Sequence, residues 1–204
     1  MRIIEDVKLD YADVLFQPKR SKLESRRDVE MLRTFTFHNS DRTFQCLPIM
    51  ASNMDGVGTF AMANVLQNYN MLTVIKKHYT IEDWENAVGH GLSLNNIAVS
   101  TGTNAIFDPD AEDYRKAKEI LTRWPDVKFI CIDVANGYQQ NFSDFVKRVR
   151  EEFPKKIIIA GNVITGEMTE QLVIAGADII LCGGMTFPKY PCIKDSEKFL
   201  IIDI

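Results

Sequence analysis

Long apolar runs are missing from this chain of 204 residues. None reaches the roughly 18 residues that a membrane-spanning helix needs, and the first ten residues lack the apolar stretch of a signal peptide. A strong excess of charge is missing as well, since the formal net charge is −4. We therefore expect neither nucleic acid nor a membrane as a main partner.

Paired cysteine motifs are also missing. The four cysteines are Cys46, Cys131, Cys182 and Cys192, and none of them forms a C-x-x-C pair. We expect no metal site from them, and Cys131 lies inside an apolar run where a thiol behaves as a small apolar side chain. This usage indicates a reducing, cytoplasmic compartment.

What the sequence does contain is a regular alternation. Short apolar runs at 47–50, 71–75, 97–99, 127–132, 156–160 and 178–181 are separated by segments with helical periodicity, and their starts lie 22 to 30 residues apart. Each connection is long enough for a crossover helix, which predicts parallel strands. Before them, T-F-T-F-H at 34–38 alternates and predicts a short β-hairpin arm. The pattern fits an open doubly wound sheet or a (β/α)₈ barrel.

A candidate dinucleotide fingerprint bears on that choice. Residues 56–61 match G-x-G-x-x-A, but five residues separate them from the strand, and the next strand ends in Lys76-Lys77 instead of an acid. We therefore interpret the glycines as a turn entering a helix and predict an α/β fold of the TIM (β/α)₈ type. We expect one incomplete barrel domain over 1–204, with an arm at 1–46, six β/α units at 47–182 and a divergent tail at 183–204.

Polar residues follow the predicted strands. Asp133 directly follows the buried run 129–132, where it either faces a ligand or caps the next helix. The other strand ends carry Asn53 and Asp55, Lys77 and His78, residues 100–103, Asn136, and Gly161-Asn162. In a barrel these ends form one ligand-binding face. Lys77 and Asp133 follow strands about 10 Å apart, so we predict a direct or water-bridged pair, acting in a cofactor site or as a structural ion pair. The basic segment 18–22 is a solvated loop or an anion site.

Six words of the sequence together resemble the IMP dehydrogenase/GMP reductase family. They are K-L-D-Y-A-D-V-L-F-Q-P-K-R-S at 8–21, P-I-M-A-S-N-M-D-G-V-G-T-F at 48–60, K-K-H-Y at 76–79, S-T-G-T at 100–103, C-I-D-V-A-N-G-Y at 131–138 and A-G-N-V-I-T-G-E-M at 160–168. The D-V-A-N-G-Y and K-H-Y words favour the GMP reductase branch, as does the lack of an inserted CBS-type module. IMP dehydrogenase remains the alternative within the family.

The resemblance implies an NADPH-dependent oxidoreductase of purine metabolism that deaminates GMP reductively to IMP and releases ammonia. It also implies a cytoplasmic homotetramer. The positions that match the family's NADPH contacts are Ser25, Arg26, Lys77, Asp133, Val134 and Ala135. Asn53, Asp55 and Asn162 lie on the expected substrate side, although a turn or cap explains them equally well.

The resemblance ends after the sixth strand. There the family continues with a loop of the form G-x-G-P-G-S-x-C-T-T-R, whose cysteine attacks the purine and whose carbonyls bind a monovalent cation, K⁺. This chain reads L-C-G-G-M-T-F-P-K-Y-P-C at 181–192, so the nucleophile is carried over to neither Cys182 nor Cys192. We expect a truncated reductase with open edges at its first and sixth strands. The alternative to an enzyme is a non-catalytic subunit that binds nucleotide or a full-length partner.

Overall fold

The computed structural model describes residues 17–102 and 111–182, together with residues 13, 15 and 108 and the backbone of a strand at 200–202. The strands are β1 (Arg33–Phe37), β2 (Arg42–Cys46), β3 (Ile49–Ala51), β4 (Leu72–Ile75), β5 (Ile97–Thr101), β6 (Phe129–Asp133), β7 (Ile157–Val163), β8 (Ile179–Cys182) and β9 (Leu200–Ile202). The helices are α1 (Phe60–Leu66), α2 (Ile81–Gly89), α4 (Glu112–Arg123), α5 (Gln140–Glu152) and α6 (Gly166–Ile174), with 3₁₀ turns η2 (Arg26–Asp28) and η3 (Gln67–Tyr69).

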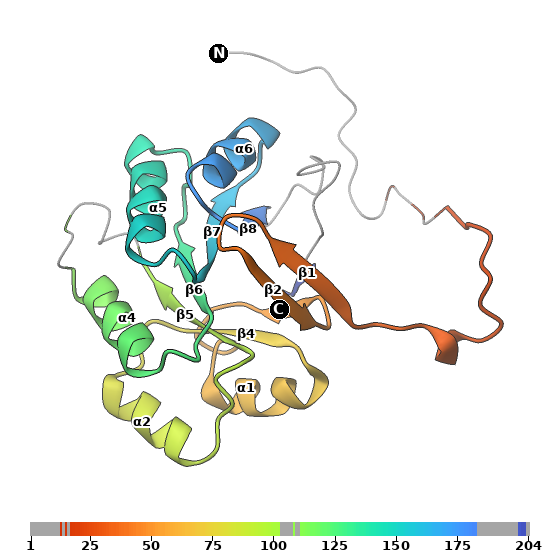
Figure 1. Ribbon diagram of the computed structural model, residues 1–204, viewed down its shortest axis with the longest axis horizontal. Helices are drawn as coiled ribbons and strands as arrows, with labels where there is room; N and C mark the ends of the chain where they lie inside the picture. Colours follow the sequence, from red (N-terminus) through yellow and green to blue (C-terminus); the bar gives the residue numbers. More distant parts are fainter. Residues whose placement is uncertain are drawn as a thin grey trace.

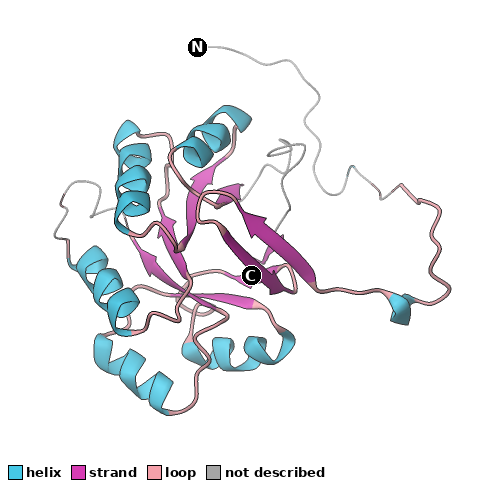
Figure 2. Cartoon of the chain, in the orientation of Figure 1, coloured by secondary structure: helices cyan, strands magenta, loops and turns pink. Residues whose placement is uncertain are grey.

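The main sheet is parallel and curls as part of a barrel. Its strand order is β8-β7-β6-β5-β4-β3-β9, so the six predicted strands lie side by side in chain order. A doubly wound sheet reverses its strand order at a switch point, and this sheet has no such reversal among β3 to β8. The incomplete (β/α)₈-type barrel is thereby confirmed. The helices lie around the outside of the sheet (Figures 1 and 2).

Local sequence explains where the helices begin. The Thr80 hydroxyl accepts from the amide of Asp83, whose carboxylate accepts from the Thr80 amide, so a capping box starts α2. The Thr165 hydroxyl caps α6 in the same way, accepting from the amide of Met168. These caps satisfy amides that the first turn of a helix otherwise leaves without partners.

The alternation of side chains along each strand divides the core into two clusters. Side chains such as Ile130 and Ile132 pack outward against the helices, with Phe142 and Tyr114. Phe129 and Cys131 point to the other face, into the barrel interior. Strands buried on both faces read as continuous apolar runs, which is why the sequence revealed them.

The predicted β-hairpin is confirmed and packs against the barrel interior. β1 and β2 pair antiparallel with Phe35 opposite Phe44, and the ring of Phe44 meets Phe129 edge-on at 4.8 Å. Phe37 and Cys46 complete the buried face of the hairpin. Burial of each aromatic ring contributes about 2 kcal/mol, and the hairpin lies across the sheet in Figure 1.

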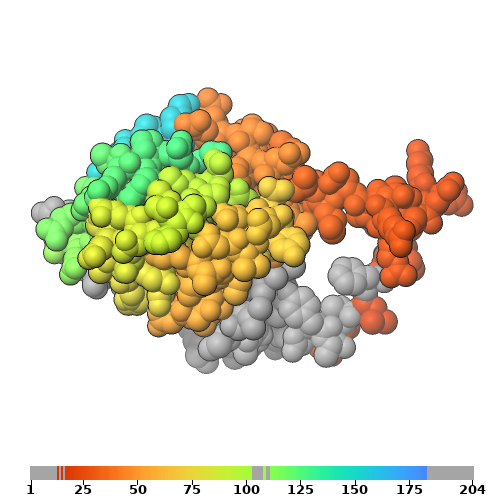
Figure 3. Space-filling model, turned by 90° about the horizontal axis from the view of Figure 1, so that it is seen from below, coloured from red at the N-terminus to blue at the C-terminus, as the bar shows by residue number. Residues whose placement is uncertain are grey.

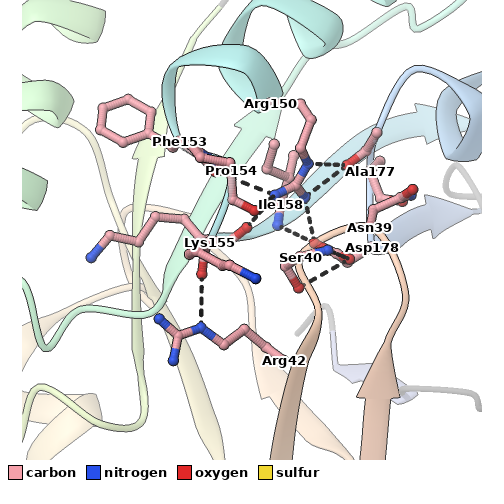
Figure 4. A network of polar contacts seen from close by, with 12 residues as sticks. Asn39, Ser40, Arg42, Arg150, Phe153, Pro154, Lys155, Ile158, Ala177 and Asp178 are labelled. Carbon is pink, nitrogen blue, oxygen red and sulfur yellow. Dashed lines mark hydrogen bonds and ion pairs between the residues drawn. The ribbon is translucent and has the colours of Figure 1, made fainter.

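A buried ion pair fastens the hairpin turn to the sheet (Figure 4). The Asp178 carboxylate, fully buried, accepts from Arg150 at 2.6 Å. It also accepts from the amides of Ser40, in the hairpin turn, and Ile158, at 3.1 and 3.0 Å. The Asn39 side-chain amide donates to the carbonyl of Val173, in the last turn of α6, and to that of Ala177, beyond the end of the helix. The hairpin, α5 and β7 are therefore joined through one carboxylate, and Asn39 joins the hairpin to α6.

One expectation about the sheet edges is wrong. The backbone of β9 pairs in parallel with β3, placing residue 200 opposite Ile49 and residue 202 opposite Ala51. The first barrel strand is therefore not an open edge. The unpaired amides and carbonyls of a sheet edge are a template to which another strand can add, and the two isoleucines of L-I-I at 200–202 are β-branched residues typical of strands.

The N-terminal segment before β1 stands away from the rest of the described chain (Figure 3). The exposed large apolar side chains of this segment, Leu15, Leu23, Val29 and Met31, are between 45% and 98% exposed. Most of the family word at 8–21, Thr103 and Cys192 lie outside the described residues. Of the helices that the structure describes, none has the length and apolar character needed to cross a membrane.

Candidate functional site

A cleft of about 600 Å³ opens where the parallel strands end. It is lined by residues that follow β3, β4, β5 and β6: Asn53, Met54, Asp55, Gly56, Val57, Lys77, His78, Thr101, Gly102, Asp133 and Ala135. The carboxyl ends of parallel strands are where barrel folds keep their ligands. The strand-end residues predicted from the sequence therefore meet largely at one place.

Asp133 ends β6 and continues the inward-facing row of Phe129 and Cys131. Its Oδ2 accepts from the Asn53 side-chain amide at 2.8 Å, and its Oδ1 accepts from that of Asn162 at 3.4 Å. It does not cap the following helix, because the N-cap of α5 is Gln139. Each carboxylate oxygen keeps one lone pair for a ligand in the cleft.

Lys77 and Asp133 line the same cleft, but the direct pair that we predicted between them does not form. Lys77 Nζ forms its ion pair with Asp113 Oδ2 at 3.1 Å, while Asp133 is held by amides. The physical reason is that α4 passes over the end of β5 and brings Asp113 to the lysine. Counting strand positions in the sheet cannot reveal a partner that comes from the helix layer.

Thr101 lies in the cleft but is missing from our predicted cofactor contacts. From the sequence we named it only as part of the strand end at 100–103. It ends β5, is 1% exposed and lines the cleft. Its hydroxyl has no hydrogen-bond partner among the residues that the structure describes. A buried hydroxyl without a partner carries a desolvation cost of about 1–3 kcal/mol, which a ligand group in the cleft would relieve.

A tightly packed glycine shapes the loop on the other side of the cleft. A Cβ on Gly58 would lie 2.8 Å from Asn53 Cα and closer still to the Val74 carbonyl oxygen. The loop 53–57 therefore rests on β4 only because residue 58 has no side chain. The glycine word at 56–61 serves this packing and not a dinucleotide fold.

The other predicted cofactor positions are dispersed. Ala135 lines the cleft, whereas Val134 is buried and exchanges backbone hydrogen bonds with residues 161 and 162. Ser25 and Arg26 lie in the exposed N-terminal segment, where the Ser25 hydroxyl accepts from the Arg27 amide. Neither of these two is among the residues that line the cleft.

Comparison with known proteins identifies the family of this chain. A model of the IMP dehydrogenase / GMP reductase domain matches residues 8–185. The chain belongs to the IMP dehydrogenase/GMP reductase family. It is 51% identical to GMP reductase 1 of Homo sapiens over 183 residues, covering 89% of this chain and 51% of that protein.

Other members of the family agree. The GMP reductase of Enterobacter sp. (strain 638) is 52% identical over 186 residues, covering 90% of this chain and 52% of the relative. The crystal structure of inosine 5′ monophosphate dehydrogenase from Legionella pneumophila superposes with a TM-score of 0.68 at 28% identity, covering 85% of this chain and 50% of that one. The chain spans about half the length of the curated relatives it matches.

The described cysteines of this family member do not line the cleft. Burial raises the pKa of the Cys46 thiol to about 12, and burial followed by the charge of Asp133 raises that of Cys131. Cys182 Sγ lies 3.4 Å from the Thr169 hydroxyl, on the helix-facing side of β8. We therefore find no activated thiolate at the cleft among Cys46, Cys131 and Cys182.

Proposed function

We propose that this chain forms the NADPH-binding part of a GMP reductase site. The reaction is the reductive deamination of GMP to IMP, with release of ammonia. The observation that supports it most is the convergence of Asn53, Lys77, Asp133 and Ala135 on one cleft. Relatives named GMP reductase, about half identical over most of the chain, support the proposal as well.

The side chains of the cleft suit NADPH. The Lys77 ammonium offers a positive charge to a phosphate, and the Asp133 carboxylate can accept from ribose hydroxyls. The Thr101 hydroxyl, which has no partner in the described part of the chain, adds a donor and an acceptor. When bound, NADPH supplies the hydride. Asn53 and Asn162 hold the Asp133 carboxylate at the mouth, and we assign Asp55 to the substrate side.

Ser25, Arg26 and Val134 remain proposed contacts of the cofactor through the family resemblance alone. The sequence after β8 has no counterpart of the loop that carries K⁺ in the family, so we assign no residue of this chain to a cation. From the same resemblance we propose that the protein is cytoplasmic and forms a homotetramer. Light scattering of the purified chain tests the oligomeric state directly. A tighter affinity for NAD than for NADPH would instead revive the IMP dehydrogenase alternative.

A non-catalytic role is the second candidate, and the position of the cysteines favours it. Covalent attack on the purine needs a placed nucleophile, and Cys46, Cys131 and Cys182 all lie away from the cleft lining. The subunit would then bind nucleotide, or associate with a full-length member of the family. We expect little or no NADPH oxidation with GMP by the chain alone, measured at 340 nm. Rapid turnover would remove this second candidate.

The cofactor assignment is tested with Lys77→Ala and a neighbouring control. Loss of a charged hydrogen bond to phosphate costs about 1.5–3 kcal/mol, so we expect about 10- to 100-fold weaker NADPH binding in a fluorescence titration. Lys76→Ala removes the same charge one residue away, from a side chain that pairs with Asp55 and does not line the cleft. Equal effects of the two changes, or no NADPH binding by the unmodified chain, would contradict the proposal.

A further inference from the structure

The helix layer holds the lysine of the cleft at both of its ends. The ammonium of Lys77 donates to the Asp113 carboxylate at 3.1 Å. The backbone carbonyl of Lys77 accepts from the ammonium of Lys116, which lies about one helical turn after Asp113 in α4. Because residues three apart share one face of a helix, a single face of α4 fixes both the main chain and the side chain of Lys77.

The strand next to Lys77 leaves room for this contact. A Cβ on Gly102 would lie 2.6 Å from Lys77 Nζ and 3.1 Å from Asp113 Oδ2. Only a residue without a side chain lets the ion pair pack this closely over the end of β5. The pair is largely shielded, with 33% of the lysine side chain and 21% of the aspartate side chain exposed.

The helix that carries Asp113 is firmly anchored. Tyr114, Ala117 and Ile120 of α4 are each at most 1% exposed and pack in the outer core cluster. The Tyr114 hydroxyl donates to Glu152 of α5 at 2.6 Å. Asp113 is thus a carboxylate on a rigid support. It does not itself line the cleft, so it acts through Lys77.

We infer that Asp113 is a positioning residue, which fixes the Lys77 ammonium at the cleft wall so that its remaining N–H groups meet the anionic cofactor. This inference rests on the proposed function of the cleft. An ammonium has three N–H donors, and Asp113 engages one of them. A free lysine side chain has many rotamers, and the ion pair removes part of this freedom before the ligand arrives.

The direction of the effect separates positioning from simple electrostatics. Asp113 carries a negative charge near a site for an anionic ligand, so its removal should tighten binding if charge alone matters. If Asp113 instead competes with the cofactor for Lys77, its removal should also tighten binding. Only the positioning role predicts weaker binding.

The experiment compares Asp113→Asn with Glu112→Gln in the whole chain. Glu112 is the neighbouring acid in the first turn of α4 and is exposed, so the control removes the same charge from the same helix end. We expect Asp113→Asn to weaken NADPH binding by about three- to tenfold and Glu112→Gln to change it by less than about twofold. Asp113→Glu, which restores the carboxylate, should recover most of the lost affinity.

A second measurement needs no ligand. The side-chain ammonium of Lys77, assigned by its loss in Lys77→Ala, is followed by ¹⁵N relaxation and should become more mobile in Asp113→Asn but not in Glu112→Gln. Unchanged mobility would overturn the inference, as would greater mobility with unchanged or tighter NADPH binding. If the unmodified chain binds no NADPH, the proposed function fails, and the cofactor part of the inference fails with it. The relaxation data alone then decide whether Asp113 fixes the Lys77 side chain.

Discussion

Removal of Arg150 should destabilise this protein more than loss of any exposed ion pair. The Arg150 guanidinium donates to the buried Asp178 carboxylate at 2.6 Å and to the Gly176 carbonyl through Nε and Nη2 at 2.9 and 2.8 Å. The guanidinium also reaches three carbonyls of the turn that follows α5. Arg150→Ala therefore leaves a buried charge and several carbonyls without their donor.

The magnitude follows from what remains around Asp178. Breaking a buried ion pair by removing one partner costs about 3–5 kcal/mol. The amides of Ser40 and Ile158 still donate to the carboxylate after the change, so we expect the lower end, about 3 kcal/mol. In a domain of this size that corresponds to a fall in Tm of about 6–12 °C.

The assay is urea unfolding followed by circular dichroism, with Lys155→Ala as the matched control. Lys155 pairs with Asp41 of the same hairpin turn at 3.1 Å, but these side chains are 59% and 88% exposed. Such pairs contribute at most about 1 kcal/mol. If Arg150→Ala costs no more than Lys155→Ala, the carboxylate does not fasten the hairpin to the sheet and our account of that network is wrong.

Three further changes test other parts of the fold by the same urea assay. Thr73→Val should raise the free energy of unfolding by about 1 kcal/mol, because the Thr73 hydroxyl is buried and has no partner within the described ranges; a loss of stability would refute this. Gly58→Ala should cost about 1–3 kcal/mol, whereas Gly56→Ala, where a Cβ meets nothing within 4 Å, should be nearly neutral; equal costs would contradict the packing argument. Burial opposes ionisation of Glu152, but hydrogen bonds from Lys118 and the Tyr114 hydroxyl outweigh it and lower the pKa of Glu152. Since this folded-state pKa is depressed, the stabilisation is present above the ordinary glutamate pKa and is lost as pH falls through the folded value, so the stability gap between the protein and Glu152→Gln should close in acid.

The elements of the barrel were predictable because they are buried in a regular way. The run 157–160 is apolar on both faces of β7, and the caps at Thr80 and Thr165 mark helix starts. The sequence did not predict that β7 extends through Gly161 to Val163. There Gly161 packs against Leu181 at a distance that excludes a side chain. The contact is between residues on different strands, so no local pattern reports it.

The sequence predicted where the site lies but not which residues contact one another there. Strand-end positions put Lys77 and Asp133 at one cleft, as the structure confirms. The partner of Lys77 was not predictable, because Asp113 lies 36 residues away. In the sequence, Asp113 reads as an ordinary acid in the first turn of a helix, where it favours the helix dipole. The sequence also did not predict that the Thr101 hydroxyl lacks a partner among the described residues, because hydrogen bonding of a buried side chain depends on the three-dimensional structure.

Lys77 and Asp133, two of the charged side chains that line the cleft, belong to different layers of the barrel. Side chains alternate along a strand, so Asp133 continues the inward row of β6, and Asn53 and Asn162 hold it from the barrel mouth. Lys77 follows Ile75, which packs outward, and Asp113 holds it from the helix layer. A ligand that contacts both Lys77 and Asp133 must therefore cross the strand ends from the interior to the helices. Its affinity then depends on how α4 packs against β5 as much as on the residues it touches.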